Sequence, residues 1–207
     1  MSSAFVIWGG AALLYAGFRL WYDGFRRPLT AAEIEAFMQQ AEKSSIERAT
    51  DLGEMRRFLE ADDGKEFVML NLVKLHADPV PHPDTGAPTK AREIVQAYMK
   101  DFLPTLLRTG GVPLMQARKV GPYVDSWDVA PDPDWTLVGY MRYRSRRDLM
   151  RLSVDPRFQD GHGYKHAAIP MTFSFPTQPQ TIGFLGPRVW VALVLALAAA
   201  LLQIATS

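Results

Sequence analysis

The sequence is organised around the stretch Phe67-Val-Met-Leu-Asn-Leu-Val-Lys-Leu75, which is almost continuously apolar and lies between the turn-forming segments Asp62-Asp63-Gly64 and Asp78-Pro79. A run of this kind predicts a strand that is buried on both faces. Successive side chains alternate between the faces, so Asn71 lies on one side and Lys74 on the other. An amide inside such a strand needs hydrogen-bond partners. We therefore predict a central strand in a sheet whose second face also covers something.

Charge is unevenly distributed along the chain. The 207 residues include 23 Lys and Arg against 22 Asp and Glu. Residues 1–22 contain one charged residue, Arg19, and residues 188–207 contain one, Arg188, which leaves 21 basic and 22 acidic residues between them. This balance excludes a dedicated nucleic-acid binder, which needs a basic surface. The absence of cysteine excludes disulfides, thiolate metal sites and cysteine nucleophiles.

Both ends of the chain are predicted to span a membrane. Residues 1–18 carry no charge, and the aromatic residues and arginines that follow them are typical of a membrane interface. A cleavable signal peptide is the competing interpretation, but the basic segment that it needs at its start is missing. Residues 189–207 also lack charge and show no polar stripe. Alanines four residues apart, Ala12 and Ala16 in the first span and Ala192, Ala196 and Ala200 in the second, allow close approach of another helix; the alternative is that alanine is simply common here.

The basic residues that flank the spans predict the orientation. All of them lie on the side of the soluble domain, at Arg19, Arg26, Arg27 and Arg188. Because basic residues accumulate on the cytoplasmic side, we predict a cytoplasmic domain with both termini outside, in a bacterial inner membrane. The predicted organisation is a transmembrane helix, a helical connector, an α+β domain, a linker and a second transmembrane helix, at residues 1–25, 26–65, 66–176, 177–187 and 188–207.

The soluble part is predicted to contain a β-α-β-β-α-β unit. Two helices precede its first strand, one with a Thr30–Glu33 capping box and one that starts near Asp51. A proline-rich loop follows the strand. The remaining elements are a long helix with a kink or a short break at Pro104, two strands, a helix that begins at Ser145 and restarts at Asp155-Pro156, and a last strand. The helix and the three strands are expected at 89–109, 112–120, 135–143 and 171–175.

These segments resemble the dimeric α+β barrel superfamily, and within it a bacterial family of unassigned function, the domain-of-unknown-function 1330 type. The resemblance covers about residues 66–176 and rests on Phe67–Leu75, Tyr98 with Gly110-Gly111, Trp135–Tyr143, Asp155-Pro156-Arg157-Phe158 and Lys165-His166-Ala167-Ala168. It implies a ferredoxin-like domain in which one sheet face packs on helices and the other meets a second subunit, so a homodimer is expected. The superfamily includes cofactor-free monooxygenases, haem-degrading enzymes, lactone isomerases and proteins without a known reaction, so the fold does not determine the function.

A ligand site is predicted inside this barrel. Asn71 is expected to point into it, joined by Gln116, Arg118 and Tyr140 from neighbouring strands and by His166. Convergent polar groups in an apolar cavity are typical of a small-molecule site. The alternative is a hydrogen-bonded network that fixes the register of the dimer.

Two further patterns have a structural alternative. His162 and His166 have the spacing of metal or haem ligands on a helix, but Gly161 and Gly163 weaken a helix there, and we predict neither a metal nor a cofactor.

A group of arginines is predicted to meet anionic headgroups, unless it forms a solvated helix start. Its members are Arg26, Arg27, Arg142, Arg144, Arg146 and Arg147.

The leading hypothesis is a membrane-anchored α+β barrel protein that binds a small hydrophobic ligand or a partner at the cytoplasmic membrane face. The alternatives are a cofactor-independent monooxygenase or isomerase with a hydrophobic substrate, and a non-catalytic accessory subunit of a larger membrane complex. The sequence does not decide whether the protein is an enzyme. It contains no phosphate-binding glycine loop, Gly-x-Ser-x-Gly elbow or paired-carboxylate motif.

Overall fold

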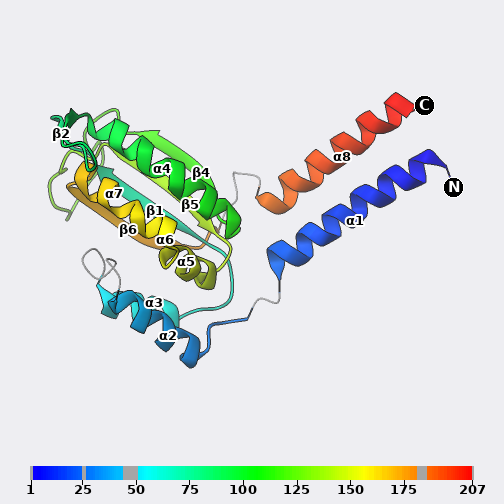
Figure 1. Ribbon diagram of the computed structural model, residues 1–207, viewed down its shortest axis with the longest axis horizontal. Coiled ribbons are helices and arrows are strands. Elements are labelled where there is room, and N and C mark those ends of the chain that lie inside the picture. The colour runs from blue at the N-terminus through cyan, green and yellow to red at the C-terminus, as the bar shows by residue number, and fades with distance from the viewer. Residues whose placement is uncertain (1, 25–26, 44–50, 181–185, 207) are drawn as a thin grey trace. The chain divides into compact units, whose positions relative to one another are not determined.

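The chain forms two units, one built from both ends (residues 1–26 and 179–207) and one from residues 27–178. The computed structural model describes residues 2–24, 27–43, 51–180 and 186–206. The larger unit contains an antiparallel sheet with helices in front of it, in the view of Figure 1.

Four strands form this sheet, in the order β4-β5-β1-β6. They are β1 (Phe67–Lys74), β4 (Val112–Arg118), β5 (Leu137–Tyr143) and β6 (Met171–Thr177). All neighbouring strands are antiparallel. The apolar stretch quoted above is therefore a central strand, as its composition predicts.

The helices of this unit join the strands in the predicted β-α-β-β-α-β sequence. They are α4 (Ala91–Arg108), α5 (Arg146–Ser153), α6 (Pro156–Asp160) and α7 (His162–Ala168). Pro104 lies inside α4 without dividing it, contrary to one of the predicted outcomes. Ser145 and Asp155 are the N-caps of α5 and α6 as expected. The loop after β1 contains a short hairpin of β2 (Val80–Pro81) and β3 (Pro88–Thr89), which was not predicted.

The helices α2 (Ala31–Glu42) and α3 (Leu52–Glu60) precede the sheet. Both halves of the Thr30–Glu33 capping box are present, because the Thr30 backbone N–H donates to Glu33 and the Glu33 N–H donates to Thr30 Oγ1. The apolar sides of α2 and α3 pack with α5 in one cluster. Its buried members are Leu29, Ile34, Met38, Leu59 and Met150.

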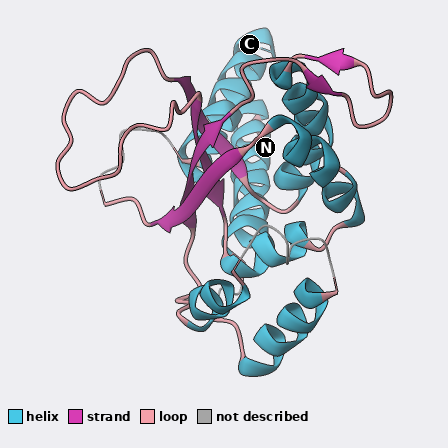
Figure 2. Cartoon of the chain, turned by 90° about the vertical axis from the view of Figure 1, so that its left-hand side faces the viewer, coloured by secondary structure: helices cyan, strands magenta, loops and turns pink. Residues whose placement is uncertain are grey.

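One face of the sheet carries the main core. Phe67 of β1 and Tyr143 of β5 stack on each other and pack against Phe102 of α4. A second cluster joins the other end of the same face to α4 and α7, through Ile94 and Ala168. Figure 2 shows the helices of this unit on one side of the strands and the long connection between β4 and β5 extending away from them.

The other unit consists of α1 (Ser3–Asp23) and α8 (Pro187–Thr206), which pack against each other. Trp8 Nε1 donates to Gln203 Oε1 at 2.6 Å, and Arg188 pairs with Asp23 at 2.7 Å, so the two helices run in opposite directions. Both are long and apolar enough to cross a membrane, judged by length and composition. The buried alanine of α8 is Ala199, whereas Ala196 is exposed, so the predicted alanine face is not the packed one.

Candidate functional site

The register of the strands separates the predicted ligand-site residues. Asn71 of β1 lies opposite Gly139 of β5, and Gly139 lies opposite Gln116 of β4, so these three residues form one row on one face. Phe67 lies four residues before Asn71 on the same face, and it packs against α4. Asn71 therefore faces the helices of its own unit, not the uncovered side on which a second subunit was expected.

The other predicted residues occupy different places. Tyr140 pairs with Leu70 and so lies on the uncovered face. Arg118 pairs with Leu137 on the helix-covered face, but it is exposed at the edge strand. His166 is an exposed residue of α7. The structure thus brings Asn71 and Gln116 into one row and leaves Tyr140 on the opposite face.

All polar atoms of the Asn71 side chain have partners within the chain. Its Nδ2 donates to the carbonyl oxygens of Met69 at 3.1 Å and Gly139 at 3.3 Å. Its Oδ1 accepts from the Ser174 hydroxyl at 2.7 Å. These bonds tie β5, β1 and β6 together across the middle of the sheet, and they satisfy an amide that would otherwise destabilise a buried strand.

The space above Gly139, which we call the hollow, has room for at least a methyl group. This glycine is buried, yet a Cβ added to it would meet no other atom within 4 Å. Its neighbours on the same face are Met141 and Leu137, which pack into the first and second core clusters respectively. Protein cores leave few such voids, because side chains normally interdigitate. Tyr164 packs against both clusters, and the space above Gly139 beside them is a candidate ligand site, which sequence reasoning missed.

The helices above this face carry titratable side chains that are largely out of water. Burial raises the pKa of the hydroxyls of Tyr98 on α4 and Tyr143 on β5, so both are neutral at pH 7. His162 on α7 is 8% exposed, and its Nδ1 has no hydrogen-bond partner within the described chain. Burial, followed by the nearby charge of Lys165, lowers the pKa of His162. This imidazole is therefore neutral under ordinary conditions.

The predicted histidine pair does lie in one helix. The rings of His162 and His166 are stacked with their centroids 6.1 Å apart, despite the glycines between and before them. No group of three or more His, Asp or Glu side chains within the described ranges has the arrangement that holds a metal ion.

The arginines predicted to meet a membrane surface are engaged in ion pairs. Arg144 makes two hydrogen bonds to Asp148, at 2.7 and 2.9 Å, and Arg142 pairs with Glu66. The remaining pairs join Arg146 to Asp62, and Arg27 and Arg147 to Glu33. The side chains of Arg142, Arg144, Arg146 and Arg147 are 7–18% exposed. These contacts give the group a structural role, while Arg26 lies outside the described residues.

The uncovered face of the sheet is apolar. Leu70, Tyr140 and Phe175 form one row across it, and Leu72, Val138 and Phe173 form the next. Phe173 and Phe175 are 47% and 44% exposed and stack on each other. Met115 and Met171 are exposed on the same face. Trp135 packs on Phe173 and donates to Tyr123, so the β4–β5 connection covers only one end of this surface.

Comparison with known proteins supports the fold alone. No family model matches the chain, so the resemblance to the domain-of-unknown-function 1330 type gains no support there. No curated protein matches either. A protein of unknown function from Rhodopseudomonas palustris is 23% identical, with a TM-score of 0.53 over 64% of this chain and 96% of that one. Its methylated form gives 22% identity and a TM-score of 0.52, over 65% and 96% of the two chains. An uncharacterised NIPSNAP-like domain protein from Burkholderia xenovorans is 16% identical over 59% of this chain and 90% of that one, with a TM-score of 0.36. The chain therefore contains an α+β fold with a four-stranded antiparallel sheet that is shared with proteins of unknown function.

Proposed function

We propose that this chain is a membrane-anchored protein whose ferredoxin-like unit binds a small, mostly apolar ligand between its sheet and its helices. The observation that carries this proposal is the open space above the buried Gly139. Ligand sites are typically apolar cavities with a few placed polar groups. Because Gly139 is buried and has no side chain, it leaves room for a ligand against the helix-facing side of the sheet.

The residues around the hollow define the ligand class. Met141 and Leu137 flank Gly139 on the floor, and both are apolar. The Asn71 amide lies beside them, but its hydrogen bonds are already made within the sheet. A ligand with several polar groups would leave some of them unpaired, at about 1–3 kcal/mol each. We therefore propose a compact, largely hydrophobic molecule.

The uncovered face supports pairing with a second copy, as the resemblance implies. Large exposed apolar surfaces on soluble units mark contacts with other molecules. The rows of Phe173 and Phe175 would supply such a contact, and a second copy of the same face is complementary to it by symmetry. Pairing of this kind would complete the proposed dimeric barrel.

The terminal helices support attachment to a membrane. The arginines near their ends favour a cytoplasmic location for the larger unit. Attachment of this kind would give the protein access to molecules that dissolve in lipid, which agrees with an apolar site.

Binding is tested with indole, a compact and mostly apolar probe, on the full chain in mild detergent. We expect indole to raise the melting temperature of the wild type and not that of Gly139→Leu, which fills the hollow. Gly121→Leu is the matched control, because Gly121 is exposed and also has no neighbours within 4 Å of an added Cβ. An equal response of the wild type and Gly139→Leu would refute the site.

A further inference from the structure

Lys165 lies on the inner side of α7. Gly161, Lys165 and Ala168 follow one another at helical spacing and so share one helix face. A Cβ on Gly161 would lie 3.1 Å from Cδ2 of Tyr98, and Ala168 is fully buried in the cluster that contains Ile94. Both neighbours of Lys165 on this face therefore contact α4, so the partly buried Lys165 lies between them at the edge of the layer formed by α7, α4 and the sheet.

The Lys165 ammonium has no compensating charge. It makes no hydrogen bond and no ion pair in the part of the chain that the structure describes, whereas Arg144, which precedes α5, is paired with Asp148. Burial lowers the pKa of Lys165. His162 on the same helix is close enough for the lysine charge to lower the pKa of the imidazole. Burial among largely neutral groups favours the uncharged amine, because no anion is present to stabilise the ammonium.

Lys165 and Gly139 have similar positions relative to the two core clusters. On the sheet, the row of Asn71 and Gly139 separates the cluster around Phe67 from the cluster around Leu75. On α7, Lys165 lies between Gly161, which touches the first cluster at Tyr98, and Ala168, which belongs to the second. Lys165 therefore lies between the two clusters along α7, as Gly139 does along β5.

We infer that Lys165 forms an imine with the carbonyl group of an aldehyde or ketone held above Gly139. This inference rests on the proposed ligand site and adds the chemical class of its ligand. The nitrogen lone pair of the neutral amine forms a bond to the carbonyl carbon, and the carbonyl oxygen leaves as water with the two protons that the nitrogen loses. No oxidant, reductant or metal is needed. Unpaired lysines in apolar surroundings are suited to this reaction, because only the uncharged amine is a nucleophile.

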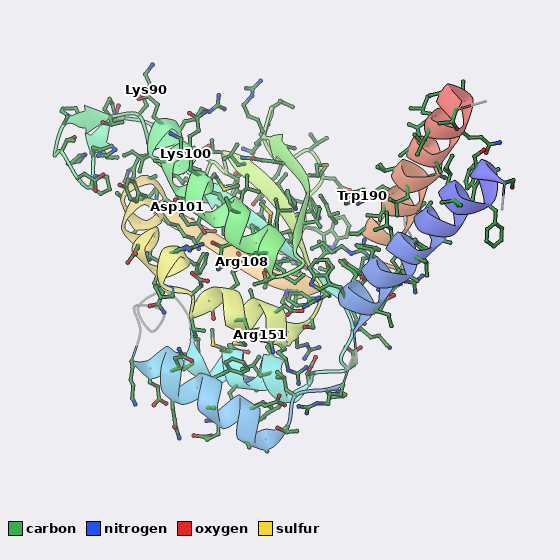
Figure 3. All side chains as sticks on the ribbon, turned by 45° about the vertical axis from the view of Figure 1, so that its right-hand side comes forward. Lys90, Lys100, Asp101, Arg108, Arg151 and Trp190 are labelled. Atoms are coloured by element: carbon green, nitrogen blue, oxygen red, sulfur yellow. The ribbon has the colours of Figure 1, made fainter. Side chains whose placement is uncertain are left out.

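The test uses the full chain in mild detergent with benzaldehyde and cyanoborohydride at pH 7, and measures the modification of each lysine by peptide mass spectrometry. Lys100, an exposed residue of α4 that is labelled in Figure 3, is the internal control. We expect Lys165 to react at least about tenfold faster than Lys100, since each unit by which a pKa falls raises the neutral fraction about tenfold at neutral pH. Lys165→Arg should lose this modification while Lys100 reacts as before. Reaction of Lys165 no faster than that of Lys100 would overturn the inference.

Benzyl alcohol separates the imine from the ligand site, because it has nearly the same shape as benzaldehyde and cannot form an imine. We expect it to raise the melting temperature and to slow the modification of Lys165 at least about fivefold at saturation, where over four-fifths of sites are filled. Binding of benzyl alcohol without modification of Lys165 would overturn the imine and leave the proposed function standing. If benzyl alcohol neither slows the modification of Lys165 nor raises the melting temperature, both the imine and the proposed ligand site are overturned.

Discussion

Two glycines in the same unit should respond in opposite ways when a methyl group is added to each. Gly139 and Gly111 are both buried, and neither has a positive φ, so alanine can adopt the backbone of either. They differ in what the new methyl meets. At Gly139 it meets nothing within 4 Å, whereas at Gly111 it lies 2.9 Å from Cγ of Leu106 and closer still to Cδ1.

The expected magnitudes follow from this difference. Gly139→Ala reduces the freedom of the unfolded chain and strains nothing, which stabilises a protein by about 0.4–1 kcal/mol. Gly111→Ala forces the fully buried Leu106 to move, and overpacking of this kind costs about 1–3 kcal/mol. One kcal/mol shifts the melting temperature of a unit of this size by about 2–4 °C. Gly139→Ala should therefore melt about 1–4 °C higher than the wild type, and Gly111→Ala about 2–12 °C lower.

The assay is thermal unfolding of the full chain in mild detergent, followed by tryptophan fluorescence, to which the buried Trp135 contributes. Both variants are measured beside the wild type at one protein concentration, because association would otherwise change the apparent stability. If Gly139→Ala lowers the melting temperature as much as Gly111→Ala does, the space above Gly139 is filled, and the ligand site fails with it.

Three further predictions concern the scaffold. Asp148→Ala should destabilise the unit by about 3–5 kcal/mol in urea unfolding, because it removes the carboxylate that accepts two hydrogen bonds from the mostly buried Arg144; a loss below 1 kcal/mol would contradict this. The Thr30 backbone N–H, and then Arg147, lower the pKa of Glu33 to about 2. A lowered carboxyl pKa stabilises the folded state above the unfolded value of 4.5 and loses that effect as the pH falls toward 2, so Glu33→Gln should flatten the pH dependence of the melting temperature across this window. Phe175→Glu should convert the proposed dimer to a monomer in native mass spectrometry, whereas Val124→Glu, in the exposed β4–β5 connection, should not.

The sequence was sufficient to predict the strands and helices to within about two residues in most cases, because their patterns are local. It could not show which face of β1 meets the helices. Both faces are apolar, so alternation assigns Phe67, Met69 and Asn71 to one side without saying what covers that side. Only the packing of α4 on Phe67 decides it, and the expected position of Asn71 was wrong for this reason.

The arginines show a second limit of sequence reasoning. Five of them within ten residues suggest a basic surface when they are read along the chain. Arg144 and Arg151 pair with the nearby Asp148, but the other partners come from far away, with Glu66 76 residues before Arg142 and Glu33 114 residues before Arg147. Pairing over such separations depends on how α2 and the start of β1 dock beside α5. Composition therefore indicated charge, and only the fold showed that the charge is compensated.

Two local irregularities in the sequence did carry information about the candidate site. Gly139 interrupts a strand that otherwise favours β structure, and Lys165 sits on the helix face that also bears the buried Ala168. A glycine weakens a strand interior, and an unpaired lysine is destabilising in an apolar layer. Sequences tend to break local rules where function requires it. Both irregularities lie at the boundary between the same two core clusters. This position favours a common function, in which Gly139 provides the space for a ligand and Lys165 provides the group that reacts with it. If the two were unrelated, filling the space at Gly139 would leave the reactivity of Lys165 unchanged.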